Sequence, residues 1–576
     1  MKDNTFRIGL CMAGAVSAGA YTAGVMDYLT EALNEWEKRR GEEGTPTHKV
    51  VIPVMGGASA GGMTTIVTAS AITNPIKHMS IPLHKDILKE HPENRFYNTW
   101  VDLLGEDMFS KMLETGDIKD GKIISLLNSE FIDDIAHKIT SLQTGTIKVP
   151  SYFEMPVKIF TTLSNLEGFD YNTNFNASAR KEKYTMTVHN DYACFGFYDT
   201  EEEKRAIPKG WIPLNFKTGE NAGIAKDAAM ATGAFPVGLK SRVLKRDGKD
   251  ITGNKWNEKV LRNNPIPDGE FSTLNVDGGM INNEPFEKVR DLLDDITIDK
   301  GIIKVESAIQ AAQELTELNS LYEKFVNTVL MIDPFPTKEK DKKKSGFGLK
   351  QDLMSVVGYT FGAMMNQMRV KPENYKAAML DSDASQFIIS PSRHFVDAEG
   401  KVNDVFGEKA IACGALGGFS GFMSKEFRVH DYYLGRFNCE IFLRDYFTIP
   451  AKSIEANNIF REGYKDIDRT RFKSTFDDSY QIIPIFTPHP GKGVFPMPVF
   501  ENGNSWPLIK QEVIEKFRPK IKSRAQKILL NILKLDTLNR ILVFAGAKIV
   551  LNRMIADKAL RAIKGSLDDW KLLIKK

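Results

Sequence analysis

Two short motifs hold a hydroxyl and a carboxylate in contexts that suit acyl-transfer chemistry. The first is Gly57-Ala58-Ser59-Ala60-Gly61, a G-x-S-x-G pattern in which a serine on a sharp strand-to-helix turn acts as the nucleophile. The second is Asp277-Gly278-Gly279, which follows the short apolar run Leu274-Asn275-Val276. A carboxylate that is hydrogen-bonded to a serine hydroxyl can take its proton directly. The two motifs therefore predict a Ser59–Asp277 dyad.

The base is sought among the carboxylates because the histidines lack a suitable context. None of the nine histidines follows an apolar strand in the way that the histidine of a catalytic triad does. His430 has the most regular context, a helix, where a hydrogen-bonded structural histidine is expected. Asp277 ends an apolar run and precedes two glycines that allow a tight turn. A structural role remains its alternative, since Asp-Gly also favours type I′ hairpin turns.

The residues around Ser59 predict a buried strand, a sharp turn and a buried helix. No charged residue occurs between Lys49 and Lys77, and an apolar β-branched run stops at a glycine cluster before a small-residue segment of helical length. A Cβ atom at Gly57 or Gly61 would clash across such a turn. The N-terminal amides of the helix point at the serine, where negative charge develops during acyl transfer. The alternative is a chance G-x-S-x-G in a chain that contains 44 glycines.

A second strand-to-helix connection lies near the N-terminus. Phe6–Met12 is predicted as a buried strand, and a small-residue loop leads from it into an amphipathic helix that runs to about Arg39. Such a loop presents free backbone N–H groups at the sheet edge where open α/β sheets bind ligands. The loop predicts an oxyanion hole formed by Gly14, Ala15, Val16, Ser17, Ala18 and Gly19. Its alternative is a plain connection that packs closely through Gly and Ala.

The rest of the sequence suggests three parts. Residues 1–335 are predicted as a catalytic α/β domain with a polar helical insertion at about 77–150 that caps the site. Residues 336–515 are predicted as a helical and mixed extension packed on that domain, and residues 516–576 as a basic amphipathic helical tail. Arg242–Glu270 is interpreted as a polar loop because it shows little periodicity. Leu349–Val370 is predicted as a Met-rich helix whose methionines pack in the core.

Composition describes an ordinary globular protein with an uneven distribution of charge. The 576 residues are 42% hydrophobic and 26% charged, with a net charge of +3. From Lys516 to the end, 16 Lys or Arg stand against four Asp or Glu. The tail is either an interfacial anchor for anionic lipid or a helical pair packed on the body with solvated cations. Nucleic-acid binding is not expected because aromatic residues are not interleaved with the basic ones.

Cysteine content and hydropathy indicate the compartment. No C-x-x-C spacing occurs among the four cysteines, which suits a reducing environment without a disulfide framework or metal site; they are Cys11, Cys194, Cys413 and Cys439. The uncharged stretch Ile8–Met26 is poor in Leu, and we do not expect it to be a signal peptide. No other run of 18 apolar residues exists. A cytoplasmic protein is predicted, with peripheral association at the inner membrane face as a further expectation.

The order of these motifs resembles that of patatin-like phospholipases. The Gly/Ala loop, Ser59 in its elbow and Asp277 before two glycines succeed one another as in that family, and Ala228–Pro236 resembles the small-residue helix ending in Phe-Pro that precedes the family's aspartate. The resemblance covers about Phe6–Phe286, interrupted by long insertions. Leu416–Leu443 is similar to a segment of larger bacterial patatin-related proteins.

This resemblance implies a fold and an activity. The fold would be an α/β/α sandwich with a central, mostly parallel sheet, here with large helical insertions and a basic helical extension. The activity would be hydrolysis of fatty-acyl esters of phospholipids by a Ser–Asp dyad, without histidine, metal or cofactor. Ser59 and Asp277 inherit the dyad roles from the motifs they match. The oligomeric state is not predicted.

The loop that would form the oxyanion hole departs from the family pattern. The family usually has three glycines, a variable residue, an Arg or Lys, and a glycine. Aligned through Gly19, this chain has Ala15 and Val16 at two of the glycine positions and Ala18 at the basic position. Backbone N–H groups can still line a hole, because every residue except proline carries one. The identity of the amides that point inward is left open.

Three functions follow as hypotheses. The leading one is a lipid acyl hydrolase of the phospholipase A or lysophospholipase type. The second is a soluble esterase or thioesterase. The third is a non-enzymatic membrane-surface binding protein with a degenerate hydrolase core, which the altered loop favours and the intact Ser59 and Asp277 oppose.

Overall fold

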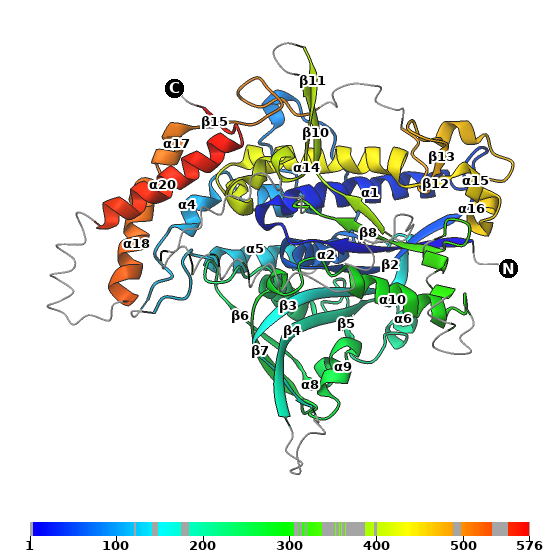
Figure 1. Cartoon of the computed structure of the whole chain (residues 1–576), viewed down its shortest axis with the longest axis horizontal. Coiled ribbons are helices and arrows are strands. Elements are labelled where there is room, and N and C mark those ends of the chain that lie inside the picture. The colour runs from blue at the N-terminus through cyan, green and yellow to red at the C-terminus, as the bar shows by residue number, and fades with distance from the viewer. Residues whose placement is uncertain are drawn as a thin grey trace.

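Within the part of the chain that the structure describes, a nine-stranded sheet lies at the centre (Figure 1). The computed structural model describes residues 4–119, 122–140, 148–173, 184–303, 310, 314–315, 317–319, 321–336, 352, 356, 359, 363, 386–396, 400–487, 497–532 and 551–574. The main strand order is β5-β4-β3-β2-β1-β8-β9, and β7 pairs with β3 and β6. The strands are β1 (Thr5–Met12), β2 (Lys49–Gly57), β3 (Phe153–Thr173), β4 (Tyr184–Phe197), β5 (Ile212–Leu214), β6 (Arg242–Asp247), β7 (Glu270–Asp277), β8 (Asn327–Ile332) and β9 (Gln386–Ile389).

Parallel pairing brings distant parts of the chain to one edge of the sheet. Strand β1 pairs in parallel with β2 and β8, β2 with β3, and β8 with β9, whereas β3 pairs antiparallel with β4 and β7. Met12 lies opposite Gly57 at the ends of β1 and β2, and Leu163 lies opposite Asp277. The predicted α/β class with a mostly parallel sheet is confirmed, and the loops after β1, β2 and β7 share one edge.

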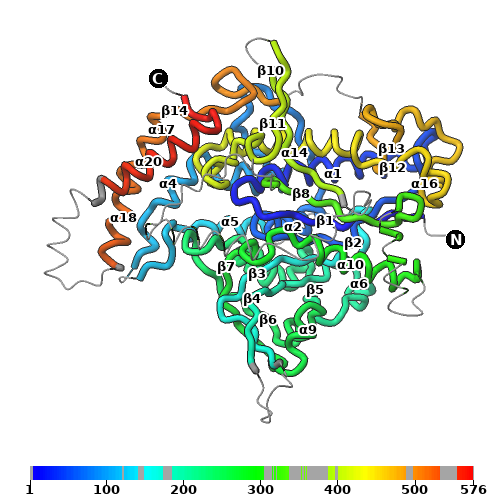
Figure 2. The backbone as a smooth tube through the Cα atoms, in the orientation of Figure 1, coloured from blue at the N-terminus to red at the C-terminus, as the bar shows by residue number. Residues whose placement is uncertain are grey.

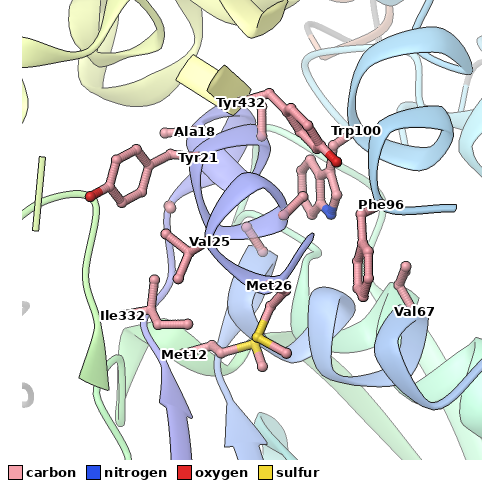
Figure 3. Packing of buried hydrophobic residues seen from close by; sticks show 14 of the residues in the cluster. Met12, Ala18, Tyr21, Val25, Met26, Val67, Phe96, Trp100, Ile332 and Tyr432 are labelled. Atoms are coloured by element: carbon pink, nitrogen blue, oxygen red, sulfur yellow. The ribbon is translucent and has the colours of Figure 1, made fainter. Parts of the chain in front are cut away.

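Helices cover both faces of the sheet, so the central strands are buried on each side. Helices α1 (Gly19–Arg39), α2 (Ser59–Ala71) and α7 (Ala222–Thr232) lie on one face, and α10 (Phe286–Asp299) lies on the other. Figure 3 shows Met12 of β1 against Met26 of α1, with Val25 and Ile332 beside them. Cys11 points to the opposite face, where it packs in one cluster with Val289 and other residues of α10.

A long helix from the extension lies directly on α1. This helix, α14 (Lys425–Ile441), runs beside α1 although about 400 residues separate them, as the blue and yellow tubes of Figure 2 show. The backbones approach so closely that a Cβ at Gly24 would lie 1.9 Å from the Tyr432 carbonyl oxygen. Burial alone would raise the pKa of the Asp27 carboxyl on α1, but Arg436 of α14 and His78 hold it below its usual value. The extension is therefore packed into the core of the α/β unit.

Short elements of the insertion and the extension complete the described fold. Those of the insertion are α3 (Arg95–Tyr97), a π-helical turn (Asn98–Asp102), α4 (Met108–Met112) and α5 (Glu130–Thr140). Others between the strands are α6 (Glu201–Arg205), α8 (Gly248–Thr252) and α9 (Lys255–Leu261). Those of the extension are the hairpin β10 (Ser392–Val396) and β11 (Val402–Phe406), the pair β12 (Thr448–Pro450) and β13 (Ser479–Gln481), and helices α15 (Ala451–Ile454) and α16 (Asn458–Gly463).

The basic tail is helical and lies against the insertion. Helix α17 (Gln511–Glu515) leads into the tail, which itself contains α18 (Arg518–Ile532) and α20 (Leu551–Asp569). Strand β14 (Ile509–Lys510), which precedes the tail, pairs with β15 (Leu573–Ile574) at its end. Arg524 of α18 is only 2% exposed and donates from two guanidinium nitrogens to the Asp117 carboxylate, each at 2.8 Å. The Arg524 guanidinium therefore stabilises the packing of the tail on the insertion.

One sequence interpretation is wrong, and a second is not tested by the structure. Arg242–Glu270, interpreted as a polar loop, contains β6, α8 and α9. The alternating buried positions of β6 include Arg242 and Arg246, which are ion-paired with Asp133 and Asp191, so hydrophobic periodicity could not reveal the strand. The helix predicted over Leu349–Val370 lies almost entirely outside the described residues. The division into 1–335, 336–515 and 516–576 stays a prediction.

Candidate active site

Ser59 stands on a strained turn between β2 and α2. Its φ is +49°, a left-handed conformation that residues with a side chain rarely adopt. A Cβ at Gly61 would lie 2.1 Å from the Met12 carbonyl oxygen, and one at Gly57 would lie 2.6 Å from the Gly61 carbonyl carbon. Both positions therefore require glycine. The turn places Ser59 at the N-terminus of α2. The Ser59 amide donates a hydrogen bond of 2.9 Å to the Thr232 hydroxyl oxygen.

The Asp277 carboxylate meets the Ser59 hydroxyl. Ser59 Oγ donates to Asp277 Oδ2 over 2.6 Å. The other carboxylate oxygen, Oδ1, accepts from the Gly279 amide at 2.7 Å, which fixes the orientation of the carboxylate. Ser59 is 7% exposed and Asp277 is 6% exposed, so bulk water competes little with this contact. The geometry suits direct proton transfer from the hydroxyl to the carboxylate.

The backbone after Asp277 turns into a helix and not into a hairpin. Gly278–Met280 form one 3-10 turn, and the chain continues into α10. The strands that pair with β7 are β3 and β6, which both precede it in the sequence, so the type I′ hairpin alternative is wrong. A Cβ at Gly278 would lie 2.0 Å from the Thr162 carbonyl oxygen, and one at Gly279 would lie 2.6 Å from Asn283 Oδ1. The two glycines thus let the turn close against β3 and Asn283.

The loop Gly14–Gly19 lies beside the serine. A Cβ at Gly14 would lie 3.0 Å from Ser59 Cβ, and Val16 lines the same cavity as Ser59. The Gly14 amide points to the Asn283 carbonyl at 3.3 Å, and the amides of Ala18 and Gly19 donate to the carbonyls of Ala15 and Val16. Because these three N–H groups already donate to carbonyl oxygens, fewer of the six predicted residues can donate to an oxyanion.

The amides of three residues near the serine remain open. In the described residues nothing accepts a hydrogen bond from the N–H of Ala15, Val16 or Ala60. Ala60 follows Ser59 directly, at the position that contributes an oxyanion donor in nucleophile elbows. Sequence reasoning did not single out Ala60, although the G-x-S-x-G motif itself identifies it.

A segment of the extension holds the loop in place. The Ser17 hydroxyl donates to the Gly418 carbonyl and accepts from the Gly421 amide at 3.1 Å. Val16 has a φ of +50°, and a Cβ at Gly418 would lie 2.9 Å from Val16 Cβ. The segment 416–422 is therefore a structural part of the site, although no sequence motif linked it to Ser17.

An apolar cavity of about 100 Å³ opens beside Ser59 and Asp277. Three parts of the chain contribute its walls: the insertion, the region of α7, and the extension. The lining residues include Trp100, Leu104, Phe131 and Ile135 from the insertion, Met230, Phe235 and Leu239 after β5, and Phe419 and Phe422 from the extension. Figure 3 shows Trp100 near Phe96 and Tyr432, with which it packs in one core. The apolar lining suits an alkyl chain.

Other candidate groups lie away from the dyad. His430 is buried on α14, where its Nδ1 lies 2.7 Å from Asp431 Oδ1, and it does not line the cavity. The four cysteines are buried free thiols. Over the described part of the chain, no group of three His, Cys, Asp or Glu residues is placed to hold a metal ion.

Comparison with known proteins agrees with this architecture. Residues 10–290 match the family model of patatin-like phospholipases, which are lipid hydrolases. The chain belongs to the patatin-like phospholipase family. An uncharacterized protein of Sinorhizobium fredii, y4iI, is 31% identical over 533 residues, which cover 84% of this chain and 71% of the relative.

Proposed function

We propose that this protein is a serine lipid acyl hydrolase of the phospholipase A or lysophospholipase type. The observation that carries the proposal is the 2.6 Å hydrogen bond from Ser59 Oγ to Asp277 Oδ2 in the lining of an apolar cavity. Membership in a family of lipid hydrolases supports the substrate class.

The reaction divides into two transfers. As Ser59 Oγ bonds to the acyl carbonyl carbon, its proton passes to Asp277 Oδ2, and the carbonyl oxygen becomes an oxyanion. The amides of Ala60, Ala15 and Val16 are the donors we assign to that oxyanion. The intermediate then collapses, and the leaving lipid alcohol takes the proton from Asp277. A water molecule repeats the sequence on the acyl-enzyme and releases the fatty acid.

The cavity favours a long acyl chain over a small soluble ester. Its walls are aliphatic and aromatic, and of the two basic side chains that line it, Arg242 is paired with Asp133 at 2.6 Å. A soluble esterase or thioesterase has no need of a wall built from three separate parts of the chain. The non-enzymatic alternative is opposed by the assembled Ser59–Asp277 contact.

We also infer that the protein works at a membrane surface from the cytoplasmic side. Among the described helices, none is both long enough and apolar enough to cross a bilayer. We propose that contact with the substrate lipid is peripheral. The helical basic tail is one candidate for this contact, although Arg524 is committed to Asp117.

Product analysis tests the proposal. Vesicles of mixed phospholipids are incubated with the wild type, with Ser59→Ala, and with Ser110→Ala as a control for loss of a serine that does not line the cavity. Mass spectrometry of the products should detect free fatty acids and lysophospholipids with the wild type and the control, and none with Ser59→Ala. Release of fatty acid by folded Ser59→Ala would overturn the proposal.

A further inference from the structure

We propose that the protein docks on anionic phospholipid bilayers through an apolar rim beside the cavity. The rim consists of Ile124, Leu126, Phe235 and Val237. This inference rests on the proposed function for its choice of partner, and it extends that function by assigning the contact to a surface other than the basic tail.

The rim places four large apolar side chains in water. Their exposed fractions are 52% for Ile124, 47% for Leu126, 42% for Phe235 and 72% for Val237. Single exposed apolar residues are ordinary, but a group of them beside a cavity marks a binding surface. Val237 also has a φ of +65°, a conformation unfavourable for a β-branched residue. Val237 therefore exposes an apolar side chain from a strained backbone position.

The rim is one built surface, because two segments are joined through their backbones. The Leu126 amide donates to the Val237 carbonyl and the Leu127 amide donates to the Gly238 carbonyl, both at 2.9 Å. From behind, the buried Arg524 donates to the carbonyls of Leu126 and Ser125. The tail helix α18 thus supports the rim from inside the protein.

The occupant is a lipid bilayer because the rim continues into the acyl cavity. Phe235 is exposed at the rim and also lines the cavity with Ser59. It packs edge-to-face on Phe419 with the ring centroids 5.6 Å apart. An acyl chain that leaves a bilayer pressed on this rim would enter the cavity without crossing water.

Cations flank the apolar side chains. Lys119 and Lys122 are exposed on the segment that leads to Ile124, and Lys240 follows Val237 on the other segment. Of the described carboxylates, none is paired with these three lysines, whereas the neighbouring Arg242 is paired with Asp133. Apolar side chains bordered by lysines are the pattern of proteins that bind at an anionic lipid interface.

Vesicle co-sedimentation tests the rim in a Ser59→Ala background, so that the vesicles are not consumed. The vesicles contain phosphatidylcholine and phosphatidylglycerol. Leu126→Ser/Val237→Gly removes two rim side chains that do not line the cavity, and glycine suits the backbone at position 237. We expect the affinity for vesicles to fall by about 10-fold or more. Two controls should bind like the background protein: Val402→Ser, which removes a 57% exposed valine from β11, and Lys558→Gln/Arg561→Gln on α20.

Several results would contradict the proposal that the rim binds bilayers. These are unchanged binding by Leu126→Ser/Val237→Gly, lost binding by the tail variant, and no vesicle binding by the background protein. A fourth is a concentration-dependent dimer, seen by sedimentation velocity, that the rim variant abolishes without any effect on lipid. In the active background, the rim variant should keep its rate on a soluble short-chain ester, which shows that it folds.

The rim and the catalytic proposal can fail separately. If vesicle binding depends on the rim but the wild type releases no fatty acid from any lipid, the catalytic proposal is wrong and the docking proposal is supported. If hydrolysis depends on Ser59 but the rim substitutions leave vesicle binding unchanged, the docking proposal is wrong and the catalytic proposal is supported.

Discussion

The elbow at Ser59 and the loop Gly14–Gly19 bend the backbone on two sides of the same cavity, but they are held in different ways. At the elbow, Gly57 and Gly61 provide the space that the turn requires, and both lie two positions from Ser59. In the loop, Val16 adopts a φ of +50° in a small-residue connection where glycine would fit without strain. Ser17, Gly418 and Gly421 supply the contacts that hold the loop. The conformation of the elbow depends on glycines next to Ser59, whereas the conformation of the loop depends on a segment about 400 residues away.

This difference has an energetic consequence. A non-glycine residue in the left-handed region costs about 1–3 kcal/mol, which the surrounding contacts must offset. The segment around Gly418 is itself unusual, since Leu416 and Gly417 also have positive φ values of 58° and 61°. It is tied in turn to the tail, because the Leu416 amide donates to Ser566 Oγ of α20 at 2.9 Å. The catalytic loop is therefore linked to the C-terminal helices through two successive contacts.

The largest effect is expected at the dyad, where the elbow presents Ser59 to Asp277. Asp277→Asn preserves the shape of the side chain and removes its basicity, and kcat should fall by about 10³–10⁴-fold. Initial rates on phospholipid vesicles and on a soluble ester measure this. Asp404→Asn, on the hairpin of β10 and β11, is the control and should keep full activity. A folded Asp277→Asn with a rate within tenfold of the wild type would exclude Asp277 as the base.

Substitution of an elbow glycine should have the next largest effect. Gly61→Ala places a Cβ against the Met12 carbonyl, so the elbow must shift, and kcat/KM should fall by at least about 100-fold with a lower melting temperature. Gly223→Ala is the matched control, because its Cβ meets nothing within 4 Å. Activity and thermal unfolding are measured on both. Equal behaviour of the two variants would show that the elbow does not need its glycine.

Loss of the hydrogen bonds between Ser17 and the extension should have a smaller effect. A second substitution, at Val16, should reverse it. Ser17→Ala leaves the Gly421 amide and the Gly418 carbonyl without this partner, and kcat should fall by about 10-fold with KM nearly unchanged. Val16→Gly removes the strain that the support offsets, so Val16→Gly/Ser17→Ala should regain most of the lost kcat. Steady-state kinetics on one soluble ester compare the three variants. No recovery in the double variant would contradict the role of Ser17 as a positioning residue.

The smallest effect concerns the amide of the nucleophile. Thr232→Val removes the acceptor of the Ser59 N–H and should lower kcat by about 5-fold, the equivalent of one ordinary hydrogen bond. Thr232→Ser keeps the hydroxyl and should restore the rate. If serine and valine behave alike at this position, the hydrogen bond contributes nothing to the elbow.

Much of the fold was predictable where the sequence is locally periodic or rich in glycine. The strand Phe6–Met12, the strand before Gly57 and the helix after Ser59 lie where the sequence predicted them. Strand β6 was missed because its inward positions hold ion-paired arginines. Local patterns report burial of apolar side chains, and they fail where burial is achieved by ion pairs.

The site was predictable only in part for a related reason. The motifs around Ser59 and Asp277 drew attention to two residues that the structure brings into hydrogen-bond contact. The support of Ser17 by Gly418 and Gly421, the cavity walls at Phe419 and Phe422, and the rim supported by Arg524 all join segments hundreds of residues apart. Such contacts leave no spacing signal in a single sequence.

Covalent labelling tests most directly whether Asp277 activates Ser59. A fluorophosphonate probe reacts with the enzyme, and peptide mass spectrometry locates the adduct while the rate of labelling is followed. We predict one adduct, on the peptide that contains Ser59, and a labelling rate in Asp277→Asn that is lower by at least about 100-fold. An adduct on another residue, or equal labelling rates in Asp277→Asn and the wild type, would contradict the account.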